Sequence, residues 1–194
     1  MIQRLFSVRS LLVICALALL QVLAQPLAHA DEVEILQARV ESSDEGYRLS
    51  ATFDLDLNRE LEDAIMRGIP LYFTTEVQVV RPRRYWFDET TLTTSQTIKV
   101  SHNVLTRQYR AAIDGGLHRN FNTLDEALSM VRNPGRWLIA EKGMLKPGET
   151  YHAFVRMGLD IAQLPKPFQV NALNNSDWRV SSDWKQLTFK ADAQ

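Results

Sequence analysis

The chain has 194 residues, with 22 basic and 23 acidic side chains and a formal charge of −1. Such a balance excludes the strongly basic surface that nucleic-acid phosphates favour, so we expect no nucleic-acid partner. The only cysteine is Cys15, which excludes an internal disulfide and a site built from several thiolates.

The first thirty residues have the pattern of an export signal. Arg4 and Arg9 form a basic end, residues 11–24 are almost entirely apolar, and Ala28-His29-Ala30 resembles a cleavage site. We therefore predict that residues 1–30 are a cleaved signal peptide and that the protein is exported. Removal of two arginines and no acid would change the formal charge to −3.

The alternative to cleavage is an uncleaved membrane anchor. A spanning helix needs about 20 apolar residues, whereas Gln21 interrupts this segment and Pro26 closes it. Cleavage is favoured, and the anchor stays open as an alternative. The small residue that lipid attachment requires is missing before Cys15, so lipoprotein processing is not predicted. Residues 31–194 then form one domain without a thiol, large enough for an ordinary core.

Alternating apolar and polar residues predict β-strands. The alternation is strict over residues 47–57, and residues 33–40 precede it across a turn at 42–46, which predicts a hairpin. Residues 71–79 predict a further strand, which leads to Pro82, a residue that disfavours a central ladder position. The remaining predicted strands cover residues 85–89, 96–102, 105–113, 136–140, 151–161, 168–172 and 187–189.

Two short helices are predicted between the strands. Asn58 can cap the first, which Gly68 and Pro70 end. Thr123 and Glu126 have the spacing of a capping box and open the second. Many short strands with only two helices in connections favour an all-β antiparallel β-sandwich of the immunoglobulin-like kind over a parallel sheet.

Three stretches carry a resemblance to a known family: residues 61–73 (LEDAIMRGIPLYF), 83–88 (RRYWFD) and 164–168 (LPKPF). With these, nearly the whole chain after the signal resembles a domain-of-unknown-function family of exported proteins from Gram-negative bacteria. The resemblance implies a periplasmic address. Members of that family are encoded near membrane-bound sensor kinases of the nitrogen-regulation type, which implies a link to envelope signalling. It implies no catalytic residue.

The predicted binding residues are Arg83, Arg84 and Trp86. They belong to a segment that gathers three guanidinium groups beside two aromatic rings, and arginine and tryptophan are common interface anchors. In the alternative, one aromatic set enters the core, Arg84 pairs with Asp88, and the other charges protect an edge strand.

Two further tryptophans, Trp178 and Trp184, each follow an aspartate and could form an aromatic platform for a sugar ring. The alternative is that they pack in the core, as large aromatic side chains commonly do. Acid pairs such as Asp54 and Asp56 could perform glycoside chemistry, or could simply solvate a face.

The remaining chemistry-bearing residues predict no metal, cofactor or catalytic site. His102, His118 and His152 lack metal-ligand spacing, and neither a G-x-S-x-G elbow nor a phosphate-binding loop occurs. The sequence thus favours a non-catalytic periplasmic interaction module, whose partner is an envelope or membrane-anchored protein, for example of a sensor-kinase system. The alternative is a cell-wall carbohydrate-binding module or hydrolase.

Overall fold

The computed structural model describes residues 33–83 and 89–192. The predicted signal peptide (1–30), Arg84, Trp86 and most of the strand predicted at 85–89 lie outside the described residues.

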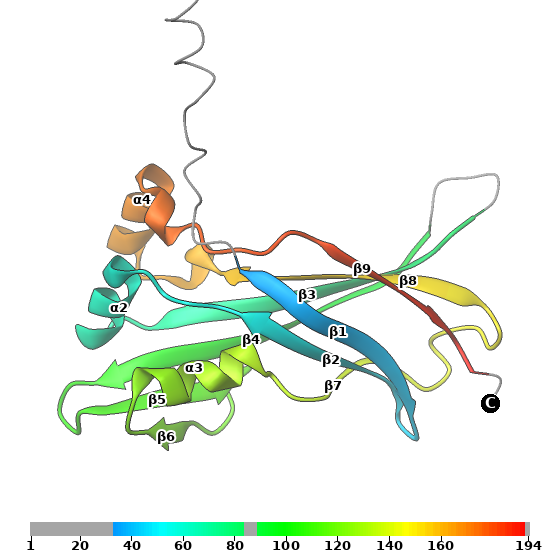
Figure 1. The fold of residues 1–194 in the computed structure, drawn as a ribbon, viewed down its shortest axis with the longest axis horizontal. Coiled ribbons are helices and arrows are strands. Elements are labelled where there is room, and N and C mark those ends of the chain that lie inside the picture. The colour runs from blue at the N-terminus through cyan, green and yellow to red at the C-terminus, as the bar shows by residue number, and fades with distance from the viewer. Residues whose placement is uncertain (1–32, 84–88, 193–194) are drawn as a thin grey trace, which may run out of the picture.

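The described chain forms two antiparallel sheets, as Figure 1 shows. The small sheet has the order β1-β2-β7 and the large sheet has the order β6-β5-β4-β3-β8-β9. The small sheet consists of β1 (Glu34–Ser43), β2 (Gly46–Asp54) and β7 (Trp137–Glu141), and the large sheet of β3 (Leu71–Arg81), β4 (Glu89–Asn103), β5 (Gln108–Ile113), β6 (Arg119–Phe121), β8 (Thr150–Leu159) and β9 (Lys185–Lys190).

One apolar layer fills the space between the sheets. Phe53 of β2 belongs to the same buried cluster as Phe73 of β3, Val100 of β4 and Tyr151 of β8. The alternate residues of the large sheet point to its other face, where Glu76 of β3 lies. This inside-outside alternation confirms the predicted all-β antiparallel sandwich. Its immunoglobulin-like character stays a prediction.

Both predicted helices are present with their predicted caps. In α2 (Arg59–Met66) the Asn58 side chain accepts a hydrogen bond from the Leu61 amide. In α3 (Leu124–Arg132) Thr123 and Glu126 form the complete capping box. The short connections at these places therefore follow from local sequence alone.

The strand predicted at residues 168–172 is wrong, because this segment belongs to a third helix, α4 (Lys166–Asn174). Its apolar residues at 168, 170 and 172 imitate the period of a strand, but Phe168 and Ala172 are also one helical turn apart. Phe168 packs against the core and Ala172 is buried, while Val170 is 59% exposed. Pro167 in the first helical turn favours this conformation.

Smaller differences concern strand ends. The strand predicted from residue 105 begins only at Gln108, because residues 104–107 form a turn in which Arg107 has a φ of 55°. The strand β6 was not predicted at all, and its three residues are too few to show a period. Two short 3-10 helices, Ile161–Gln163 (η1) and Ser176–Trp178 (η2), flank α4.

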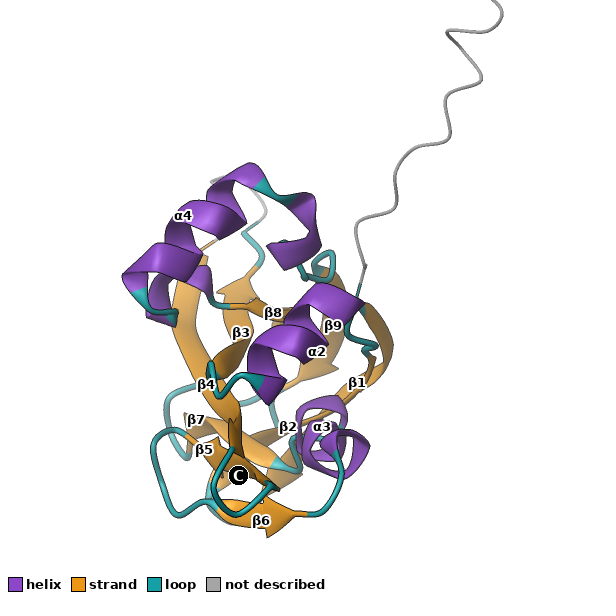
Figure 2. Ribbon diagram, turned by 90° about the vertical axis from the view of Figure 1, so that its left-hand side faces the viewer, coloured by secondary structure: helices purple, strands orange, loops and turns teal. Residues whose placement is uncertain are grey.

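The helices complete the core where the small sheet does not cover the large one. The apolar faces of α2 and α3 supply Leu61, Ile65, Leu128 and Val131 to the buried cluster. Figure 2 shows α2, α3 and α4 together at one end of the molecule. Across residues 33–83 and 89–192, no helix combines the length and the apolar character needed to cross a bilayer.

We expect Gly46→Ala to destabilise the fold more than Gly143→Ala. Gly46 has a φ of 141°, and a Cβ there would lie 2.1 Å from the Ala140 carbonyl oxygen in the neighbouring strand β7. Gly143 also has a positive φ, 88°, but its Cβ would meet no heavy atom within 4 Å. The control variant therefore carries only the cost of backbone strain at a positive φ, about 1–3 kcal/mol.

Urea denaturation measures both variants. Gly46→Ala should lose about 1–3 kcal/mol more than Gly143→Ala, which is the usual cost of overpacking. Equal losses would contradict the close approach of β2 and β7.

Candidate functional site

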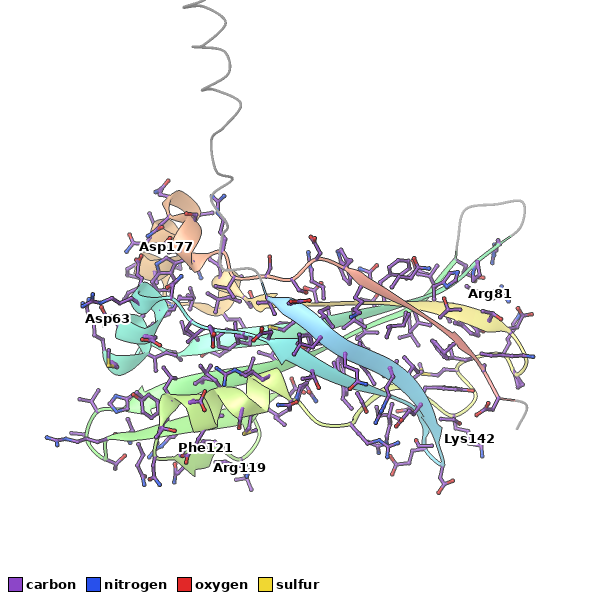
Figure 3. All side chains as sticks on the ribbon, viewed as in Figure 1. Asp63, Arg81, Arg119, Phe121, Lys142 and Asp177 are labelled. Atoms are coloured by element: carbon purple, nitrogen blue, oxygen red, sulfur yellow. The ribbon has the colours of Figure 1, made fainter. Side chains whose placement is uncertain are left out.

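A cluster of three charged groups lies where β3 and β4 meet the loop that connects them. We call this place the hairpin base. Arg81 ends β3 and Glu89 begins β4, and the Arg81 Nη2 atom donates to Glu89 Oε2 at 2.5 Å. Arg83 donates to the same oxygen. Figure 3 shows Arg81 at the end of the molecule opposite Asp63 of α2. The hydrogen bonds from Arg83 and then Arg81 hold the pKa of Glu89 below its ordinary value.

Of the three predicted binding residues, the structure describes Arg83 alone. It brings Arg83 together with Arg81, which belongs to the same predicted segment, and with Glu89, which was not predicted as part of it. Arg84 and Trp86 lie outside the described residues, as does the alternative ion pair of Arg84 with Asp88. Glu89 joins the cluster because it lies opposite Arg81 in the β3–β4 pairing. The charges on Arg81 and Glu89 are the only trace of this pair in the sequence.

A second surface lies at the helical end of the sandwich. Nine large apolar side chains are exposed in the described residues, and five come from α2, α4 and the β4–β5 turn. We call these five the apolar end: Met66, Val104, Leu105, Val170 and Leu173. Their exposed fractions run from 47% for Met66 to 96% for Leu105. They lie on elements at the same end of the sandwich, and exposed apolar side chains gathered in one region are typical of an interaction site.

Specific contacts hold the apolar end together. His102 Nδ1 donates to the Met66 carbonyl oxygen at 3.2 Å, which ties the last turn of α2 to β4. A Cβ at Gly68, just after α2, would lie 3.5 Å from Val104 Cγ2. The end of α2 therefore lies against the β4–β5 turn that carries Val104 and Leu105.

A polar bridge connects α2 with η2 and so with α4. The Glu60 carboxylate accepts hydrogen bonds from Trp178 Nε1 and Asn175 Nδ2, both at 2.7 Å. Trp178 also packs on Phe168 of α4, with 5.9 Å between ring centroids. Because α2 and α4 both contact Trp178, the tryptophan fixes the position of one helix relative to the other.

The sequence missed the apolar end. Leu105 was assigned to a strand and Val170 to a strand that is a helix, so neither had a visible reason to be exposed. The available signal was Val104-Leu105 between Asn103 and Thr106, two apolar residues inside a polar turn.

The two tryptophans proposed as a sugar platform have different environments. Trp178 is 2% exposed and belongs to the core, as the structural alternative expected. Trp184 is 39% exposed and borders a groove of about 430 Å³ with Glu34, Asp183 and Lys185. The Arg156 guanidinium lies 4.6 Å from the centre of its ring, so one ring face is already covered.

A neighbouring groove of about 420 Å³ contains two carboxylates, Glu76 and Asp160. Arg156 binds Glu76 at 2.8 Å, and Asp160 accepts hydrogen bonds from Ala162 and Gln163. Both acids therefore stabilise local structure.

The three histidines are separated in the fold. His102 packs on Tyr109, His152 contacts the Thr188 hydroxyl at 3.0 Å, and His118 lies in the β5–β6 loop. Within the described ranges, no group of three or more His, Cys, Asp or Glu residues has the arrangement needed for a metal ion.

We expect Arg83→Gln to raise the pKa of Glu89 toward its ordinary value, because the variant loses the guanidinium that lowers it most. A carboxyl group whose pKa is lowered by folding stabilises the folded state at pH values above its ordinary pKa. This stabilisation is lost as the pH falls through the lowered pKa. Between the ordinary and the lowered pKa of Glu89, the unfolding free energy of the variant should therefore fall less with decreasing pH than that of the wild type.

Carboxyl-detected NMR titration measures the pKa directly. Arg119→Gln, on the distant strand β6, is the matched control and should leave Glu89 unchanged. An unchanged Glu89 pKa in both Arg83→Gln and Arg81→Gln would contradict the ion-pair cluster.

Comparisons with known proteins bear on the chain as a whole. A family model described as "Domain of unknown function (DUF4390)" matches residues 30–188. Neither the curated proteins nor the solved structures contain a match. Since the matched segment includes nearly all of both sheets and all three helices, the chain belongs to the DUF4390 family.

Proposed function

We propose that this protein is an exported, non-catalytic domain of the periplasm that works by binding a protein partner. The observation that carries the proposal is the apolar end, where Met66, Val104, Leu105, Val170 and Leu173 are exposed on one end of the sandwich. Residues 1–30, with the pattern of a cleaved signal peptide, support the periplasmic address.

The surroundings of the apolar end favour a partner surface with an apolar centre and acidic groups at its rim. Arg67 follows Met66 and Arg107 follows the Val104-Leu105 pair, and both arginines are exposed. No salt bridge joins either of them to an acid among the residues with described positions. An apolar centre with a charged rim is the usual anatomy of a protein interface.

The partner that we propose is a membrane-anchored envelope protein, and the periplasmic part of a sensor kinase is the first to test. The family resemblance, with its link to sensor kinases, motivates this choice. The hairpin base with Arg83, together with the predicted residues Arg84 and Trp86, is a second place for contact with the same partner.

A second candidate function is glycan binding through Trp184. The exposed ring beside a groove of about 430 Å³ favours it, because a sugar ring stacks on an aromatic face. If the protein were instead a hydrolase that used Glu76 and Asp160, these acids would first have to lose their hydrogen bonds to Arg156 and Gln163.

Photo-cross-linking in intact cells tests the first function. We expect a cross-linking residue at position 105 or 173 to capture the same membrane-anchored protein. Leu36, 53% exposed on β1, is the matched control position and should capture none. Leu105→Ser with Leu173→Ser should weaken binding of the purified partner at least about tenfold, because truncating central interface residues is costly.

The thermal midpoint of the double variant must match the wild type for this loss to count. Equal capture from positions 36, 105 and 173 would contradict the proposed surface, and capture from position 83 alone would move it to the hairpin base. Glycan adducts from position 184, without protein adducts elsewhere, would replace protein binding with the second function.

A further inference from the structure

The outer face of the large sheet contains a basic pocket, on the two strands that the β4–β5 turn joins. Its volume is about 230 Å³, and it lies between β4, β5 and the β5–β6 loop. We call it the basic pocket, and its polar lining side chains are Lys99, Ser101, Arg110 and His118. None of its lining residues is acidic.

The pairing of β4 with β5 brings these groups together. Ser101 is directly opposite Arg110 and Lys99 is opposite Ala112, so Lys99 and Arg110 are diagonal neighbours on one face. The neighbouring residues Val100 and Ala111 point into the core and are fully buried. The basic side chains are therefore fixed on the outer face by the alternation of their strands.

The β5–β6 loop closes one side of the pocket. Gly115, Gly116 and His118 of this loop contribute to the lining. Ala112 lies on the outer face and is still only 8% exposed. The pocket is thus a recess in the sheet surface rather than a row of basic residues in open solvent.

Among the described residues, no acid pairs with the basic side chains of the pocket. Neither Lys99 nor Arg110 forms an ion pair with a carboxylate in the described part of the chain. The Arg110 Nε atom is buried from solvent and has no hydrogen-bond partner there. Lys99 lies beside the Tyr72 ring, whose centre is 5.6 Å from Nζ.

An unpaired, partly buried guanidinium is unfavourable unless something supplies acceptor oxygens. A phosphate group would supply them: its oxygens match the fork of an arginine and accept from a lysine and a serine hydroxyl. The volume is below the range of about 300–1,000 Å³ that accommodates drug-sized ligands, so the pocket fits a phosphate with little attached to it.

We propose that the basic pocket binds a phosphate group, with Arg110 as its principal ligand and with Lys99 and Ser101 beside it. Both inorganic phosphate and the exposed phosphate of a lipid head group provide this chemistry.

The purified chain is tested first with inorganic phosphate. Isothermal titration calorimetry should detect binding, and phosphate should raise the thermal midpoint more than chloride at equal ionic strength, because binding stabilises the folded state. Arg110→Gln should weaken phosphate binding at least about tenfold.

Arg119→Gln is the matched control. Arg119 lies on β6 with its guanidinium 5.5 Å from the centre of the Phe121 ring and does not line the pocket (Figure 3). It removes the same charge, so binding should change less than about twofold. Lys99→Gln should also weaken binding and replaces Arg110→Gln if that variant does not fold.

Lipid vesicles distinguish a lipid head group from inorganic phosphate as the source of the bound phosphate. Sedimentation with phosphatidylcholine vesicles that contain phosphatidic acid, dependent on Arg110, would assign the pocket to a lipid head group, and binding of inorganic phosphate alone would assign it to a soluble phosphate. Absence of both, or equal loss in Arg110→Gln and Arg119→Gln, would overturn the proposal.

Discussion

The apolar layer between two sheets of unequal width is the constraint on which the rest of the structure depends. A three-stranded sheet covers only part of a six-stranded one, so part of the large sheet's apolar face would meet water. The buried faces of α2 and α3 cover this part, with Leu61 and Ile65 fully buried. Burial of this apolar surface is the main source of stability for a chain whose described part contains no disulfide.

The positions of the candidate surfaces follow from that arrangement. Helices that complete the core at one end must also present their other faces to solvent, and there Met66 and Leu173 are exposed. The outer face of the large sheet carries Lys99 of β4 and Arg110 of β5, held in place by the pairing of the two strands. The hairpin base is stabilised separately, by Arg81, Arg83 and Glu89. Thus the helices, the outer face of the large sheet and an ion-pair cluster each position one of the surfaces.

The sequence predicted most of the fold because its main signals are local. Alternation predicted β2, β3 and β8, and cap residues such as Asn58 predicted α2. The errors came where a pattern fits two structures: Phe168 and Ala172 suit both a strand and a helix, and only packing against Trp178 decides. The apolar end and the basic pocket were not predicted, because they require knowledge of which strands pair and which helices meet. His118 and Arg110 are close only through the β5–β6 loop.

We propose that a partner covers the apolar end in the cell. Carbene footprinting of the protein in intact cells, compared with the purified protein, measures this coverage residue by residue. We expect reduced labelling of Val104, Leu105 and Val170 in cells, with unchanged labelling of Leu36 and Met144. Equal labelling of the apolar end in both samples would contradict it.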